Sequence, residues 1–273
     1  MKKNITKVLL NLLCIVLAII IVAPLAWILL NSFKTNKELF KDSLAFPEVW
    51  QFANYVKAWN LGLYKYFGNS LFVSVLSLCG ILASSSFLAY GLTRFRAKGS
   101  NIIFIIVLGG MALSEQVALV PLYKILRTLK IYDTYWAVIL PYIAFRIPFT
   151  VFLMRAYFIS IPVELEEAAV VDGYNSLQIF VKIILPISKP IFASCAIVNL
   201  NFVWNEFLFA NVFLNNKALQ TIPIGLMTFK GDLKVDYTTT LAGLMIASAP
   251  LIILFICMSR QFVRGLTSGA VKG

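Results

Sequence analysis

Three ionisable side chains lie inside long apolar stretches of this 273-residue chain, at Glu115, Arg146 and Glu206. A charged group at membrane depth is energetically costly, so each of the three is a functional candidate by default. The segment 199–206 adds amide and indole groups to this set, at Asn199, Asn201, Trp204 and Asn205. If this segment is one helix, Asn199 and Glu206 share nearly the same face.

Two interpretations of these side chains remain open. Asparagines, a carboxylate and an indole suit recognition of a polyhydroxyl solute, through hydrogen bonds and apolar contact with its ring faces. The alternative is that they only hold helices together. An ion pair within the membrane, of Arg146 with Glu206 or with Glu115, is a second form of this alternative.

Several kinds of chemistry are excluded by residues that the chain lacks. It has no histidine, which removes Ser-His and Cys-His nucleophilic sites and histidine-ligated metals. It has no G-x-x-x-x-G-K-[ST] phosphate loop, so it cannot use ATP by that route. Its four cysteines lie in separate apolar blocks, where we expect buried free thiols. We therefore expect no catalysis, no cofactor and no metal in this chain.

The composition is that of an all-α integral membrane protein. Hydrophobic residues make up 60% of the chain, charged residues 13%, and the mean hydropathy is +0.85. The net charge of +12 comes from scattered basic residues, which favours contact with anionic lipid over nucleic acid. Six apolar stretches are long enough to predict transmembrane helices, at Val8–Leu30, Phe67–Leu92, Ile102–Tyr123, Trp136–Phe158, Ile191–Phe213 and Thr239–Met258.

The loop 160–190 is the one long polar-containing segment that is patterned as built structure. Pro162 and three glutamates, Glu164, Glu166 and Glu167, are typical of a helix N-terminus. Gly173 is placed to end this helix in a left-handed conformation. Ser176 is then predicted to cap a second helix, Leu177–Leu185, which Pro186 closes. A helix, a glycine corner and a second helix indicate a surface that binds a partner.

The same loop carries a family signature. Glu167-Ala168-Ala169, three residues, Gly173, nine residues and Ile183-x-Leu185-Pro186 match the E-A-A-x3-G-x9-I-x-L-P motif of ABC importer permeases at every fixed position. The chain resembles the carbohydrate-uptake branch, and within it the maltose-type (MalG-like) subunit. The residues that carry this further likeness are Asp172, the segment Trp204-Asn205-Glu206-Phe207 and the tail from Phe262 to Gly273.

The resemblance implies a type I importer permease fold, with residues 1–66 as a first span and extracytoplasmic loop, 67–260 as the permease core and 261–273 as a cytoplasmic tail. It places both termini in the cytoplasm, which the nearly even distribution of basic residues leaves undecided. It implies a multi-pass protein of the cell (plasma or inner) membrane, embedded in lipid. The implied partners are a second homologous permease, an ABC ATPase homodimer and an extracytoplasmic sugar-binding protein.

The resemblance also implies roles for two sets of residues. ATPase-coupling residues are expected at Glu164, Glu166, Glu167, Ala168, Ala169, Asp172 and Gly173, and a second ATPase contact at Gly269, Ala270, Val271 and Lys272. The expected function is ATP-driven import of a sugar or oligosaccharide. Import of a polyol or a glycerol phosphate ester is the alternative within this class, and an autonomous secondary transporter is the alternative from another class.

Overall fold

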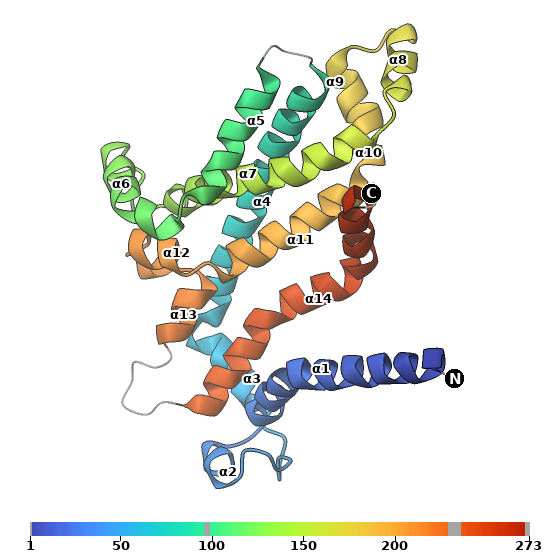
Figure 1. Cartoon of the computed structure of the whole chain (residues 1–273). Coiled ribbons are helices and arrows are strands. Elements are labelled where there is room, and N and C mark those ends of the chain that lie inside the picture. The colour runs from blue at the N-terminus through green and yellow to red at the C-terminus, as the bar shows by residue number, and fades with distance from the viewer. Residues whose placement is uncertain (1, 96–98, 229–235, 271–273) are drawn as a thin grey trace. The chain divides into compact units, whose positions relative to one another are not determined.

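The computed structural model describes residues 2–95, 99–228 and 236–270, and within these ranges it contains helices and no strands. Its longer helices begin and end as follows (Figure 1): α1 Lys2–Ser32, α4 Tyr64–Arg94, α5 Ser100–Gly109, α6 Glu115–Thr128, α7 Trp136–Ser160, α8 Glu164–Val171, α11 Lys189–Asn205 and α14 Tyr237–Ala270. The shorter helices are α2 Asn36–Lys41, α3 Ala53–Ala58, α9 Ser176–Ile179, α10 Leu185–Ile187, α12 Leu208–Phe213 and α13 Ile222–Thr228. Single turns lie at η1 Trp59–Leu63, η2 Gly110–Ala112, η3 Phe180–Ile184 and η4 Lys217–Leu219.

Within the described residues, four helices are long and apolar enough to cross a membrane, or up to six if each bent pair is one span. The expected third span is not a continuous helix, because α5 and α6 are bent by 99° at the segment between them. The fifth is also shorter than predicted, because α11 ends at Asn205 and α12 begins only at Leu208. Apolar composition predicted that these segments enter the membrane but could not locate their breaks.

Apolar side chains face outward over much of the chain. The apolar 18-residue window within Leu9–Ser32 of α1 has a mean hydropathy of 3.1 and no buried residue. This is expected where lipid hydrocarbon is the solvent. The expectation of four buried thiols is wrong for the same reason. Cys195 is buried, whereas Cys14, Cys79 and Cys257 are exposed. All four are free.

The chain forms two compact units. The first contains residues 1–65 and 225–250. Its centre of polar contacts is Asp236, which accepts hydrogen bonds from the side chains of Asn36, Lys57 and Thr238 and from the backbone N–H of Thr239. These bonds fix the start of α14 against α2 and α3 within this unit.

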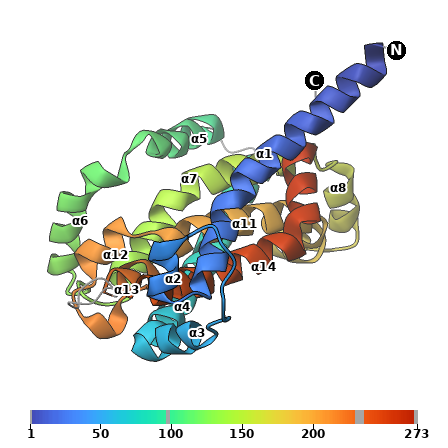
Figure 2. The same cartoon turned by 90° about the horizontal axis from the view of Figure 1, so that it is seen from below.

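The second unit contains residues 66–224 and 251–273. Helices α7 and α11 run side by side in it (Figure 1). Helix α4 approaches α7 closely at Gly80, where an added Cβ would clash with the Ile143 side chain. Helices α5 and α6 run in different directions along one side of α7 (Figure 2). Small residues at such crossings bring helices into the contact that membrane helices need.

Candidate coupling surface and solute pathway

Helix α8 begins and ends as the sequence predicts. Its three glutamates lie in the first turn, where the helix dipole favours negative charge. At its end the Gly173 N–H donates to the Val170 carbonyl and the Tyr174 N–H to the Ala169 carbonyl, both at 3.0 Å. This is a complete Schellman motif, with Gly173 at φ +83°. The left-handed glycine corner is confirmed.

The second helix of the loop differs from the prediction in its cap and its regularity. Asn175, and not Ser176, is the N-cap residue, and it forms a reciprocal capping box with Gln178. Asparagine outranks its neighbour here because its side-chain oxygen reaches the N–H three residues on. The helix then widens into the π-turn η3 before Pro186, which lies in α10.

The three glutamates of α8 have different surroundings. The Glu166 carboxylate faces the second unit's interior, where Arg94 Nε lies 2.5 Å from Glu166 Oε1, in ion-pair but not hydrogen-bond geometry. The Tyr90 hydroxyl donates to Glu166 Oε2 at 3.2 Å. Arg94 also donates through Nη2 to the carbonyls of Phe158 and Ile161, at 3.1 and 2.9 Å. One guanidinium therefore joins α4, the end of α7 and α8.

The rest of α8 faces outward. Glu164, Glu167 and Ala168 are exposed, and so are Asp172 and Gly173, whereas Ala169 is buried at 3% exposure. No sequence pattern predicts the partners of Glu166, because residues 90 and 94 are more than seventy positions away. Beside the helix lies a hollow of about 320 Å³, lined by Tyr90, Arg94, Phe95, Glu166, Glu167, Val170, Ser176 and Ile179.

The tail is only partly described. Gly269 and Ala270 are the last residues of α14. Val271 and Lys272 lie outside the described residues.

Glu206 does not belong to α11, so the predicted shared face with Asn199 is wrong. It adopts an extended conformation after Asn205. Its carboxylate accepts the backbone N–H groups of Phe209 and Ala210, at 2.7 and 3.2 Å, and the hydroxyl of Tyr142. With 8% exposure, Glu206 satisfies the first N–H groups of α12, which have no helical partner.

Arg146 has an amide partner, so the expectation of an ion pair with Glu206 or Glu115 is wrong. Its Nε donates to Asn199 Oδ1 at 2.9 Å, and no described carboxylate lies within 4 Å of it. The fully buried Asn199 donates in turn to Thr150 Oγ1 and the Cys195 carbonyl, at 3.0 and 2.8 Å. Asn199 therefore fixes Arg146 and has no free donor for a solute.

The other candidates in this segment divide between the interior and the surface. Trp204 is buried at 4% exposure, with its ring centre 5.6 Å from that of Phe67. Asn201 and Asn205 are exposed and joined by a hydrogen bond of 2.8 Å from Asn205 Nδ2 to the Asn201 carbonyl.

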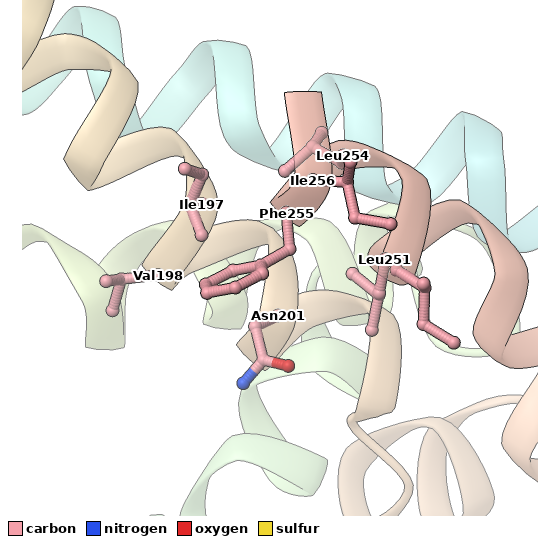
Figure 3. Close-up of a pocket in the computed structure, with 8 residues that line it drawn as sticks. Ile197, Val198, Asn201, Leu251, Leu254, Phe255 and Ile256 are labelled. Atoms are coloured by element: carbon pink, nitrogen blue, oxygen red, sulfur yellow. The ribbon is translucent and has the colours of Figure 1, made fainter. Parts of the chain in front are cut away.

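Two cavities of the second unit involve these residues. Asn201 is the polar residue of an apolar groove of about 470 Å³, which it lines with residues of α11 and α14 (Figure 3). Glu115 and Arg146 line a smaller cavity of about 240 Å³, together with Gly110, Met111, Leu113, Phe145, Phe149 and Val198. The structure thus brings Glu115 and Arg146 to the lining of one cavity, and the residues that line it include neither Glu206 nor Trp204.

Several candidate membrane spans, a polar cavity among the helices and an exposed acidic loop helix define a multi-pass membrane protein. It belongs to the family of binding-protein-dependent transport system inner membrane components, whose model matches residues 77–268. It is an ABC transporter permease of the multi-pass type, and the resemblance stated from its loop motif is confirmed.

Relatives cover nearly the whole chain. It is 48% identical to the probable ABC transporter permease protein YurM of Bacillus subtilis, over 93% of this chain and 85% of the relative. It is 34% identical to the arabinooligosaccharides transport system permease protein AraQ of the same species, over 99% and 97%. A bacterial ABC transporter that imports the acidic polysaccharide alginate contains a chain of the same fold, with a TM-score of 0.79, 22% identity and coverage of 96% and 98%.

Proposed function

We propose that this chain is the permease subunit of an ATP-driven importer for a sugar or oligosaccharide. Its family is binding-protein-dependent, and the relative AraQ is named for arabinooligosaccharides. Such names support a carbohydrate over a polyol or a glycerol phosphate ester. The translocation pathway forms between this chain and a second, homologous permease, with an extracytoplasmic binding protein delivering the sugar.

The observation that carries the coupling role is the two-sided character of α8. Its inner side is tied to the permease by Glu166 and the buried Ala169. Its outer side presents Glu164 and Glu167, with Val171 at 87% exposure. An apolar surface with two carboxylates fits an apolar cleft with basic residues, and we assign that cleft to an ABC ATPase homodimer.

This assignment supports cytoplasmic termini, because α8 must face the compartment that contains ATP. Gly269 to Lys272 are then on the ATPase side and are the proposed second contact. ATP hydrolysis belongs to the partner subunits, and the chain itself has a transport role. Closure of the ATPases moves α8, and the continuous path from α8 through η3 into α11 carries that motion towards the membrane.

Reversal of one exposed charge tests the docking. Glu167→Lys should prevent the ATPase from co-purifying with the permease, while the variant still inserts into the membrane. Glu164→Gln is the milder comparison, because it removes a charge in the same first turn of α8 and keeps the shape of the side chain. Normal ATPase recovery and normal sugar uptake with Glu167→Lys would reject α8 as the docking element.

A second test concerns the energy source. Membrane vesicles that contain this chain alone should take up no sugar, under an ion gradient or with ATP. Uptake should require the second permease, the ATPase and the binding protein. Gradient-driven uptake by the isolated chain would instead identify a secondary transporter.

A further inference from the structure

The cavity that Glu115 and Arg146 share has two ionisable side chains, whereas the larger groove of Figure 3 has Asn201 as its polar residue. We propose that this cavity is a subsite for one hydroxyl-bearing ring of the transported saccharide. Arg146 donates hydrogen bonds to the ring hydroxyls, and Glu115 accepts from them. The proposal rests on the importer function proposed above and assigns a substrate contact within that function to this chain.

The first support is the set of contacts that Arg146 makes. Its Nε is occupied by Asn199, and its Cζ lies 4.5 Å from the ring centre of Phe202. Within the described residues, no carboxylate pairs with it, so its terminal nitrogens retain donors for a ligand. A guanidinium fixed in this way loses little conformational freedom when a ligand binds.

Its position in the membrane is the second support. Arg146 lies near the middle of α7, the 25-residue helix from Trp136 to Ser160. An ionisable residue at that depth is retained where it faces a protein interior or a wet cavity. Arg146 lines such a cavity together with a carboxylate-bearing residue, Glu115.

The helix break opposite the arginine is the third support. The η2 turn is followed by Leu113 in an extended conformation, and α6 then begins at Glu115. Gly110, Met111 and Leu113 from this break line the same cavity. Non-helical backbone at membrane depth is tolerated where it is buried in protein or lines a water-filled cavity. Discontinuous helices near the midplane are also typical of substrate sites in membrane transporters.

The lining and size of the cavity indicate what it binds. Its volume of about 240 Å³ is below the ~300–1,000 Å³ typical of sites for drug-sized ligands, which fits one ring and not a whole oligosaccharide. Phe145 and Phe149 supply apolar surface for the C–H face of such a ring. Arg146 supplies donors and Glu115 supplies acceptors, and a sugar hydroxyl can satisfy each of them.

Water access and protection by saccharide test the subsite directly. In the complete transporter with its native cysteines replaced by alanine, Met111→Cys should react with a water-soluble methanethiosulfonate reagent. Oligosaccharide delivered by the binding protein should slow that reaction. The matched control is Ile106→Cys, five residues earlier on α5, where Ile106 is 69% exposed in the isolated chain. This cysteine should remain unreactive with the reagent, because lipid surrounds it. An unreactive or unprotected Met111→Cys would overturn the proposal.

Uptake by charge variants is the second readout. The Glu115 side chain has no hydrogen bond to another described residue. Glu115→Gln should therefore lower saccharide uptake about tenfold, because it removes one hydrogen bond between the sugar and a charged group. ATP hydrolysis stimulated by the binding protein should be unchanged. Arg146→Lys should behave similarly, and Arg155→Met on the same helix is the control that retains transport. Normal uptake by both cavity variants would reject the subsite.

These outcomes separate the subsite from the importer function. If the complete wild-type transporter shows no ATP-dependent saccharide uptake, the importer function fails. If wild-type uptake is normal and the cavity variants match it, only the subsite fails. If a cysteine that replaces a carboxylate residue of the second permease forms a disulfide with Met111→Cys under an added oxidant, that carboxylate fills the cavity as an ion-pair partner between subunits, and the proposal is overturned.

Discussion

Arg94 Nε lies 2.5 Å from Glu166 Oε1, and both side chains are nearly buried, with 11% and 12% exposure. The two residues come from the end of α4 and from α8, so the pair connects a membrane-spanning helix to the loop helix. An exposed pair of this kind contributes little to stability. A buried pair is different, because loss of one partner leaves an uncompensated charge.

Glu166→Gln should therefore weaken the attachment of α8 to the permease. Breaking a buried ion pair costs about 3–5 kcal/mol, so we expect a lower thermal midpoint and less sugar transported per ATP hydrolysed. Purified transporter in liposomes gives both quantities. Glu164→Gln, which changes an exposed carboxylate in the same turn, should leave the thermal midpoint unchanged.

Charge exchange provides the specific test of this pair. The double variant Arg94→Glu with Glu166→Arg should recover part of the coupling that Glu166→Gln loses. Recovery is partial because Arg94 also donates to Phe158 and Ile161. If the single variant couples normally, the pair does not transmit motion from α8.

Gly173→Val should impair coupling through backbone conformation alone. Its φ is +83°, and an added Cβ would meet no atom within 4 Å. The left-handed conformation costs roughly 1–2 kcal/mol for a residue with a Cβ, and more for a β-branched one. We expect reduced ATP hydrolysis in response to the binding protein, with normal membrane insertion. Gly173→Asn should retain more activity, and equal activity of both variants would contradict the role of the corner.

Glu206→Ala should lower stability and not sugar selectivity. The variant leaves the N–H groups of Phe209 and Ala210 and the hydroxyl of Tyr142 without their acceptor. Each unsatisfied buried group costs about 1–3 kcal/mol. Thermal unfolding in detergent measures this loss, and Asn205→Ala at the exposed neighbouring position is the control. A stable Glu206→Ala variant with altered selectivity would favour a pathway role.

The stability of the first unit should depend on pH through Asp236. Burial raises the pKa of Asp236, but hydrogen bonds from Lys57, Thr239 and Thr238 outweigh burial and lower the pKa from 3.8 to about 2. A carboxyl group whose pKa is lower in the folded state stabilises the fold at pH values above its unfolded-state pKa. This contribution is lost as the pH falls through the folded-state pKa. The difference in thermal midpoint between wild type and Asp236→Asn should thus shrink from pH 4 to pH 2, the range of these two pKa values. A difference that is constant with pH would contradict this assignment.

Local sequence patterns predict the class of protein, the apolar membrane segments and the loop helix, but not the break between α5 and α6 or the end of α11. Apolar stretches predict membrane helices because no other element satisfies the backbone there. Pro162, the three glutamates and Gly173 specify α8 through local rules that act within one or two turns. These features depend on neighbours in the chain, so sequence patterns reveal them.

The contacts of the polar residues in the membrane depend on how the helices pack in three dimensions. Glu206 and Arg146 have similar apolar sequence surroundings, yet the first caps α12 and the second lines a cavity. Their spacing predicts the same role for Glu164, Glu166 and Glu167, whereas in the structure Glu166 faces Arg94. The physical reason is that a buried polar group takes its partner from whichever helix packs against it, and that partner lies far away in the sequence.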